Sequence, residues 1–146
     1  MKYRRPIEEN ACTPVALRNC LLYKGYNYPE KELRKLLKTQ KDGTHVKDLI
    51  SGLEKLKFKP KVFIQFNQKK FKDSIDKELK ENRTIILVTD SDTHTVSLLE
   101  KEKSKYKIVD NLFDKIEQYL TFKQLERLTG FLDRQLMRTK YHFVSF

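Results

Sequence analysis

The chain has 146 residues, of which 31 are basic and 20 acidic, so its net charge near neutral pH is +11. This length is sufficient for one hydrophobic core, and we expect a single domain over residues 1–146. No stretch is apolar enough for a transmembrane helix, and the basic start of the sequence lacks the apolar run of a signal peptide. The composition therefore predicts a soluble globular protein that is not embedded in a membrane.

The first half of the sequence is predicted to be mostly helical. A helix is expected over residues 13–23, a short second helix after Pro29, and a third helix after the turn at residues 42–44. A strand at 62–66 is followed by Asn67, which is suited to cap a fourth helix. The third helix is amphipathic, because its apolar residues recur at helical spacing: Val46, Leu49, Ile50, Leu53 and Leu56.

The second half of the sequence is predicted to form strands. Residues 84–88 are continuously apolar, which is typical of a central strand, and residues 94–99 and 105–109 predict a hairpin across the charged loop 100–104. A capping box at residues 121–124 predicts a short helix that ends near Gly130, and residues 141–146 predict a last strand. Helices followed by an antiparallel sheet indicate an α+β fold, with the N-terminal helices packed on the sheet.

Cys12 lies at the expected start of the first helix. Pro14 favours a first helical turn, because its missing N–H would have no partner there. A thiol at a helix N-terminus lies at the positive end of the helix dipole, which lowers its pKa and favours the nucleophilic thiolate. We therefore interpret Cys12 as a nucleophile, against the alternative that it is a small buried apolar residue.

Cys20 lies in the middle of the same helix, among leucines, and is predicted to be a core residue. Eight residues of helix separate the two cysteines by about 12 Å, too far for a disulfide. Two free thiols favour a reducing, cytoplasmic location. Two cysteines and three scattered histidines do not form a metal-ligand pattern, so no metal or other cofactor is predicted.

His94 and Asp110 are the residues expected to act with Cys12. A histidine can take the proton of the thiol and later return it to the leaving group, and an acid can hold the imidazole ring in place. Strand alternation predicts that His94 shares a sheet face with Val96 and Leu98. Asn111 is the rival of Asp110 as third residue, because only one of two neighbouring strand residues can face the ring. His45 and His142 are weaker candidates for the base.

These features resemble the papain-like cysteine peptidases, and most closely their bacteriocin-processing-type (C39-like) branch. The similarity covers about residues 9 to 128 and rests on four segments in order: the Cys12 to Leu17 helix start, the Gly43-Thr44 turn with Leu56-Lys57-Phe58, the strand that begins with His94, and the strand that ends at Asp110. The resemblance implies a papain-like fold and a Cys12-His94-Asp110 triad.

The chain differs from that family pattern at two positions. Thr13 follows the cysteine, where the family usually has glycine, and Pro6 stands six residues before it, where the family usually has a glutamine that helps to bind the oxyanion. Asn10 is the nearest amide that can replace this glutamine. Loss of one oxyanion donor typically lowers kcat by about 10²–10³, which keeps an inactive protein among the alternatives.

The sequence therefore predicts a cysteine hydrolase that cleaves a peptide or other amide bond, with a polypeptide substrate. A transferase with another acyl acceptor would use the same residues. Two alternatives are a catalytically inactive papain-like fold that binds a protein partner, and a basic nucleic-acid-binding protein. Because positive and negative charges alternate along the predicted helices, we expect any nucleic-acid binding to be weak and non-specific.

Overall fold

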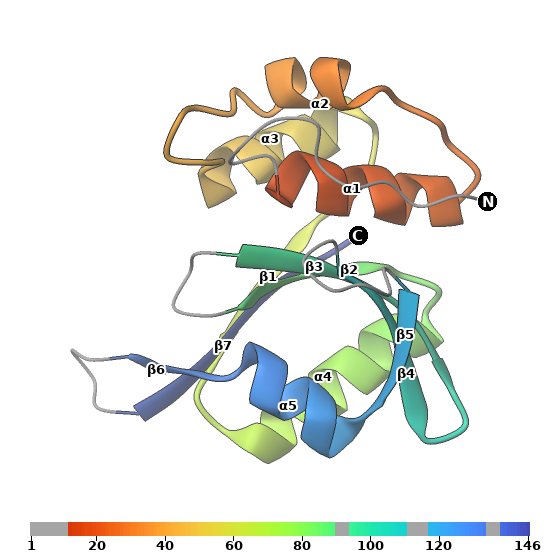
Figure 1. Cartoon of the computed structure of the whole chain (residues 1–146), viewed down its shortest axis with the longest axis vertical. Helices are drawn as coiled ribbons and strands as arrows, with labels where there is room; N and C mark the ends of the chain where they lie inside the picture. The colour runs from red at the N-terminus through yellow and green to blue at the C-terminus, as the bar shows by residue number, and fades with distance from the viewer. Residues whose placement is uncertain (1–11, 90–93, 111–116, 134–137) are drawn as a thin grey trace.

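Helices cover both faces of one antiparallel sheet in the computed structural model (Figure 1). The structure describes residues 12–89, 94–110, 117–133 and 138–146, with the backbone alone for 131–133. The helices are α1 (Cys12–Tyr23), α2 (Glu30–Leu36), α3 (Val46–Lys55), α4 (Gln68–Lys80) and α5 (Phe122–Thr129). The strands are β1 (Lys61–Gln65), β2 (Ile85–Thr89), β3 (His94–Glu102), β4 (Lys105–Val109), β5 (Glu117–Thr121), β6 (Phe131–Asp133) and β7 (Arg138–Ser145).

The strand order in the sheet is β1-β7-β2-β3-β4-β5, and every neighbouring pair is antiparallel. β6 pairs with the first residues of β7, beyond the part of β7 that pairs with β1 and β2. β2 is buried at every position, as expected for a strand in the middle of the sheet with helices on both faces. The α+β class predicted from the sequence is confirmed.

Each sheet face has its own hydrophobic core. On one face, α1, α2 and α3 pack on the strands, as the clustering of Leu17, Leu33 and Leu53 with Ile86 and Val144 shows. On the other face, α4 and α5 pack on the alternate residues of the same strands; this second cluster contains Phe71, Ile75, Ile85, Leu87, Val96, Leu98, Leu125 and Phe143. Figure 1 shows the three helix and sheet layers that result.

The capping signals in the sequence predicted helix starts well. The Asn67 side chain accepts a hydrogen bond from the Lys70 backbone N–H at 3.0 Å and caps α4. Thr121 and Gln124 form the reciprocal bonds of a capping box at the start of α5. These contacts are local, so sequence alone was sufficient to predict them.

The strand predictions were less complete. β3 extends to Glu102, so the hairpin has a tight turn with Lys103 at a φ of 57° instead of a charged loop over 100–104. β7 begins at Arg138, three residues earlier than expected. β5 and β6 were missed, because β5 is a five-residue edge strand that lies half exposed and β6 has only three residues. Within the described residues, none of the helices has the length and apolar character that crossing a membrane requires.

Candidate active site

Cys12 is the first residue of α1, and its side chain is half-buried where α1 packs on β3. Two contacts fix this end of the helix on the strand. The Ser97 hydroxyl donates a 2.7 Å hydrogen bond to the Ala16 carbonyl, and the hydroxyl groups of Thr13 and Thr95 are 3.4 Å apart. The start of α1 is therefore anchored next to the first residues of β3.

His94 is the first residue of β3, and Asp110 directly follows β4. The antiparallel register pairs Ser97 with Val109. The first residues of β3 and the last residues of β4 therefore lie next to each other, at the same end of the two strands. There the His94 Nε2 and the Asp110 Oδ1 are 2.9 Å apart, and Asp110 is only 1% exposed. Because Nε2 is bound to Asp110, Nδ1 is the ring nitrogen left to face the thiol.

The thiol and the imidazole shift each other's pKa. Burial raises the pKa of Cys12, but hydrogen bonds from His94 and Thr95 and the positive charge of His94 outweigh it and lower the pKa to about 7. Burial lowers the pKa of His94, but hydrogen bonds to Asp110 and Cys12 and their negative charges raise it to about 9. Between these values the two side chains form a thiolate and imidazolium pair, the nucleophilic form of such a site.

The second cysteine has the opposite surroundings. Cys20, in the middle of α1, is fully buried in the core between this helix and the sheet. Burial raises the pKa of its thiol to about 11. Its Sγ lies 3.9 Å from the Ile85 carbonyl oxygen. Both cysteines are free thiols, and Cys12 is the one with a depressed pKa.

Cys12 and His94 open into a cleft of about 320 Å³. One wall comes from the loop before α3, where Gly43 turns the chain at a φ of 108°, a conformation that favours glycine. The floor comes from the middle of the sheet. The cleft is lined by Cys12, Thr13, Asp42, Gly43, Thr44, His45, Val46, Leu49, Ile86, Val88, His94, Thr95, Lys140, His142 and Val144.

The structure corrects one expectation about His94. Val96 and Leu98 face the α4 and α5 side of the sheet, whereas Cys12 lies on the other side with α1. His94 nevertheless lines the cleft with Thr95. His94 is the first residue of β3, and alternation along the strand did not predict its position there.

The remaining candidates fall into two groups. His45 and His142 both line the cleft, although the sequence indicated them only as weaker candidates. The position of His142 depends on the pairing of β7 with β2, which no local sequence pattern indicated. Asn10, Pro6 and Asn111 lie outside the described residues. Among the residues that the structure describes, no three His, Cys, Asp or Glu side chains are grouped so that they could hold a metal ion.

The comparisons with known proteins agree with this arrangement. The model of the peptidase C39 family matches residues 1–128. The structure is similar to a double glycine motif protease from an AMS/PCAT transporter, solved in complex with the leader peptide, with a TM-score of 0.68 and 15% identity over 97% of this chain and 90% of that chain. No curated protein sequence matches the chain.

Two further structures are peptidase domains of ComA. That of Streptococcus ComA, a bi-functional ABC transporter involved in a quorum sensing pathway, has a TM-score of 0.64 and 15% identity over 97% of this chain and 98% of that chain. That of Streptococcus mutans ComA has a TM-score of 0.57 and 13% identity over 99% and 97%. The fold is therefore the papain-like fold of these domains, and with the family match over most of its length, the chain belongs to the peptidase C39 family.

Proposed function

We propose that the protein is a cysteine peptidase in which Cys12 is the nucleophile, His94 the general base and acid, and Asp110 the residue that orients His94. The observation that carries the proposal is the unbroken chain of contacts from the Cys12 thiol through the His94 ring to the buried Asp110, at the edge of an open cleft. An inactive binding module would need neither the depressed thiol pKa nor a cleft beside the thiol.

The reaction follows from the ion pair. The Cys12 thiolate attacks the carbonyl carbon of the scissile amide, and the carbonyl oxygen becomes an oxyanion near the Cys12 backbone N–H at the start of α1. The His94 imidazolium gives its proton to the leaving nitrogen, the C–N bond breaks, and an acyl-enzyme remains. Neutral His94 then takes a proton from water, the hydroxide attacks the thioester, and the acid product leaves as the thiolate re-forms.

We further propose a polypeptide substrate with a glycine-glycine cleavage site. The support is membership of the peptidase C39 family and the similarity to a double glycine motif protease that was solved with a leader peptide. The identity of 15% supports the fold and not the substrate, so this part requires its own test. Weak, non-specific nucleic-acid binding stays a prediction from the net charge alone.

The direct test combines thiol labelling with cleavage. Limiting iodoacetamide near pH 7.5, followed by peptide mass mapping, should label Cys12 and leave Cys20 unlabelled, because their pKa values lie near 7 and 11. A fluorogenic peptide that contains Gly-Gly should be cleaved by the native protein and by Cys20→Ala, but not by Cys12→Ala. Labelling of Cys20 ahead of Cys12, or equal cleavage by Cys12→Ala, would contradict the proposal.

The pH dependence of kcat/KM is expected to be bell-shaped. Activity should rise as the pH passes about 7, where Cys12 loses its proton, and should fall above about 9, where His94 loses the proton needed by the leaving group. Because the two groups interact, the limbs report apparent pKa values of the pair. Initial rates from pH 5 to 10 at constant ionic strength measure both limbs. A profile that keeps rising above pH 9.5 would exclude a catalytic His94 imidazolium.

A further inference from the structure

The face of β3 that lies under α1 carries two hydroxyl side chains. Thr95, Ser97 and Leu99 are alternate residues of β3, and Leu99 packs in the core between the sheet and α1. A hydroxyl that is buried without a partner costs stability, so both hydroxyl groups need hydrogen bonds. Ser97 has one with the helix backbone, because it donates to the Ala16 carbonyl at 2.7 Å. The partners of Thr95 lie about one turn earlier, at the start of α1.

Thr95 contacts the first two residues of α1. The Oγ1 atoms of Thr13 and Thr95 are 3.4 Å apart, which corresponds to a long hydrogen bond. The hydroxyl and the backbone of Thr95 also form hydrogen bonds with the Cys12 thiol. Cys12, Thr13 and Thr95 all line the cleft, and Thr13 is only 7% exposed. Two neighbouring hydroxyl groups therefore lie beside the sulfur that is proposed to react.

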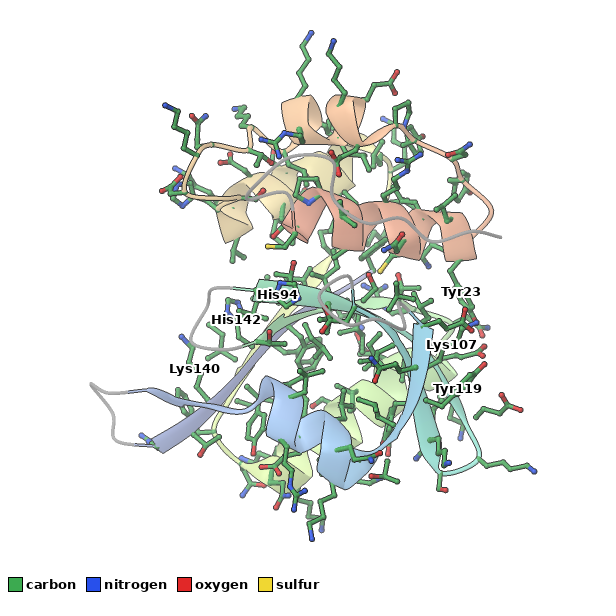
Figure 2. All side chains as sticks on the ribbon, viewed as in Figure 1. Tyr23, His94, Lys107, Tyr119, Lys140 and His142 are labelled. Atoms are coloured by element: carbon green, nitrogen blue, oxygen red, sulfur yellow. The ribbon has the colours of Figure 1, made fainter. Side chains whose placement is uncertain are left out.

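The sulfur receives hydrogen bonds from two consecutive residues of β3. In Figure 2, His94 lies at the beginning of β3, below the start of α1. Thr95 follows it directly, and both residues bond to Cys12. The contact between α1 and β3 therefore provides a second group, besides the imidazole, that can act on the thiol.

The number of available protons determines the direction of these hydrogen bonds. A hydroxyl group has one proton to donate, and its oxygen can accept two hydrogen bonds. The Cys12 thiolate can only accept, so the proton of Thr95 points to the sulfur. The hydrogen bond between the two threonines then uses the proton of Thr13, and the Thr95 oxygen accepts it. In this arrangement Thr13 holds the Thr95 hydroxyl with its proton directed at Cys12.

We propose that Thr95 is a further catalytic residue, whose hydroxyl donates to the Cys12 sulfur and stabilises its ionised form, and that Thr13 is a positioning residue that orients this hydroxyl; this rests on the proposed peptidase function. A stabilised thiolate is more abundant near neutral pH, but each thiolate is less nucleophilic. Thr95 therefore increases activity in the lower part of the active pH range and contributes little in the upper part.

The test compares Thr95→Val, which removes the hydroxyl and keeps the branched shape, with Thr95→Ser, which keeps the hydroxyl. The rate of iodoacetamide labelling of Cys12 is measured from pH 5 to 10, and peptide mass mapping separates it from Cys20. In Thr95→Val the midpoint should move up by about one pH unit, the size expected for one hydrogen bond to a charged group. The labelling rate at pH 10 should be at least as high as the native rate. Thr95→Ser should keep the native midpoint.

Cleavage of a fluorogenic Gly-Gly peptide should show the same pH dependence. With the midpoint about one unit higher, kcat/KM of Thr95→Val should be about five- to ten-fold below native at pH 6.5 and close to native at pH 8.5. A purely structural defect would instead lower kcat/KM by the same factor at both pH values. Thr13→Val should move the labelling midpoint in the same direction by a smaller amount, and it provides the test if Thr95→Val does not fold.

Thr129→Val is the matched control. Thr129 is buried at the end of α5, on the other face of the sheet, and its hydroxyl donates to the Leu125 carbonyl at 2.9 Å. Loss of this hydroxyl should leave the labelling midpoint of Cys12 unchanged. The titratable side chains that line the cleft around Cys12 are the same in every variant: Asp42, His45, His94, Lys140 and His142. A difference in midpoint between the variants therefore reports the altered hydroxyl.

The labelling midpoint decides the inference without any cleavage. A native midpoint in Thr95→Val, or in Thr13→Val where the first variant does not fold, would overturn it. A shift in Thr95→Ser as large as that in Thr95→Val would also overturn it, because the hydroxyl would then not be the cause. Shifted labelling without cleavage of any Gly-Gly peptide would contradict the proposed peptidase function and support the Thr95 contact. Cleavage with an unshifted labelling profile would support the peptidase function and refute the role of Thr95.

Discussion

Replacing His94 by glutamine should lower kcat for peptide cleavage by about 10²–10⁴, the contribution that a positioned general acid and base typically makes. Glutamine is polar and similar in length, but it can neither accept the thiol proton nor carry a positive charge. The pKa of Cys12 should then rise above its native value of about 7, because His94 supplies a hydrogen bond and a charge that lower it.

Two measurements separate this effect from a general loss of structure. The rate of iodoacetamide labelling of Cys12 as a function of pH reports the thiol pKa directly, and the midpoint of thermal unfolding reports the fold. We expect a shifted labelling profile with an unfolding midpoint close to the native one. A variant that keeps more than a tenth of native kcat would show that His94 is not the base.

Replacing Phe71 by alanine should have the largest effect on stability, a loss of about 3–5 kcal/mol, which is typical of a buried phenylalanine. Phe71 is fully buried on α4 and stacks on Tyr141 with ring centres 4.4 Å apart. It also contacts the rings of Phe122 and Phe143. The substitution therefore leaves a cavity where α4, α5 and β7 meet, and most domains have only about 5–15 kcal/mol of stability in total.

Urea unfolding followed by far-ultraviolet circular dichroism measures this loss as a lower midpoint with a similar slope. The matched control is Tyr26→Ala, because Tyr26 is 51% exposed and has an edge contact with Phe58. Its cost should stay below about 1 kcal/mol, as for most surface substitutions. Equal costs for the two variants would mean that α4 does not pack on the sheet as described.

Contacts between residues close in the sequence were predictable from the sequence, and contacts between distant segments were not. The starts of α4 and α5 were predictable because their capping contacts span only three residues. Cys12 was singled out correctly as the residue that opens α1, since Pro14 and the apolar run that follows are adjacent to it. The hydrogen bond between His94 and Asp110 also depends on a hairpin that is local in the sequence.

The remainder of the cleft depends on contacts that no short pattern contains. His142 and Lys140 reach the cleft because β7 inserts between β1 and β2, which are far from it in the sequence. Gly43 was recognised as a turn, but its place on the wall beside Cys12 results from the packing of α3 on α1 and the sheet. Hydrophobic patterns specify which side of a strand is buried, and they do not specify which strand is its neighbour.

The strand order has a consequence for how the protein acquires its structure. β1 pairs with β7 and with no other described strand, so β1 joins the sheet only when β7, which lies much later in the chain, has folded beside it. Strands that are far apart in the sequence pair slowly, because the chain between them loses conformational entropy before the stabilising contacts form. Lys140, His142 and Val144 of β7 line the cleft, whereas the Cys12 thiol beside it belongs to α1, far earlier in the chain. A chain in which β7 has not yet paired therefore has the thiol but only part of the cleft beside it, so the pairing of β7 is the step that completes the cleft.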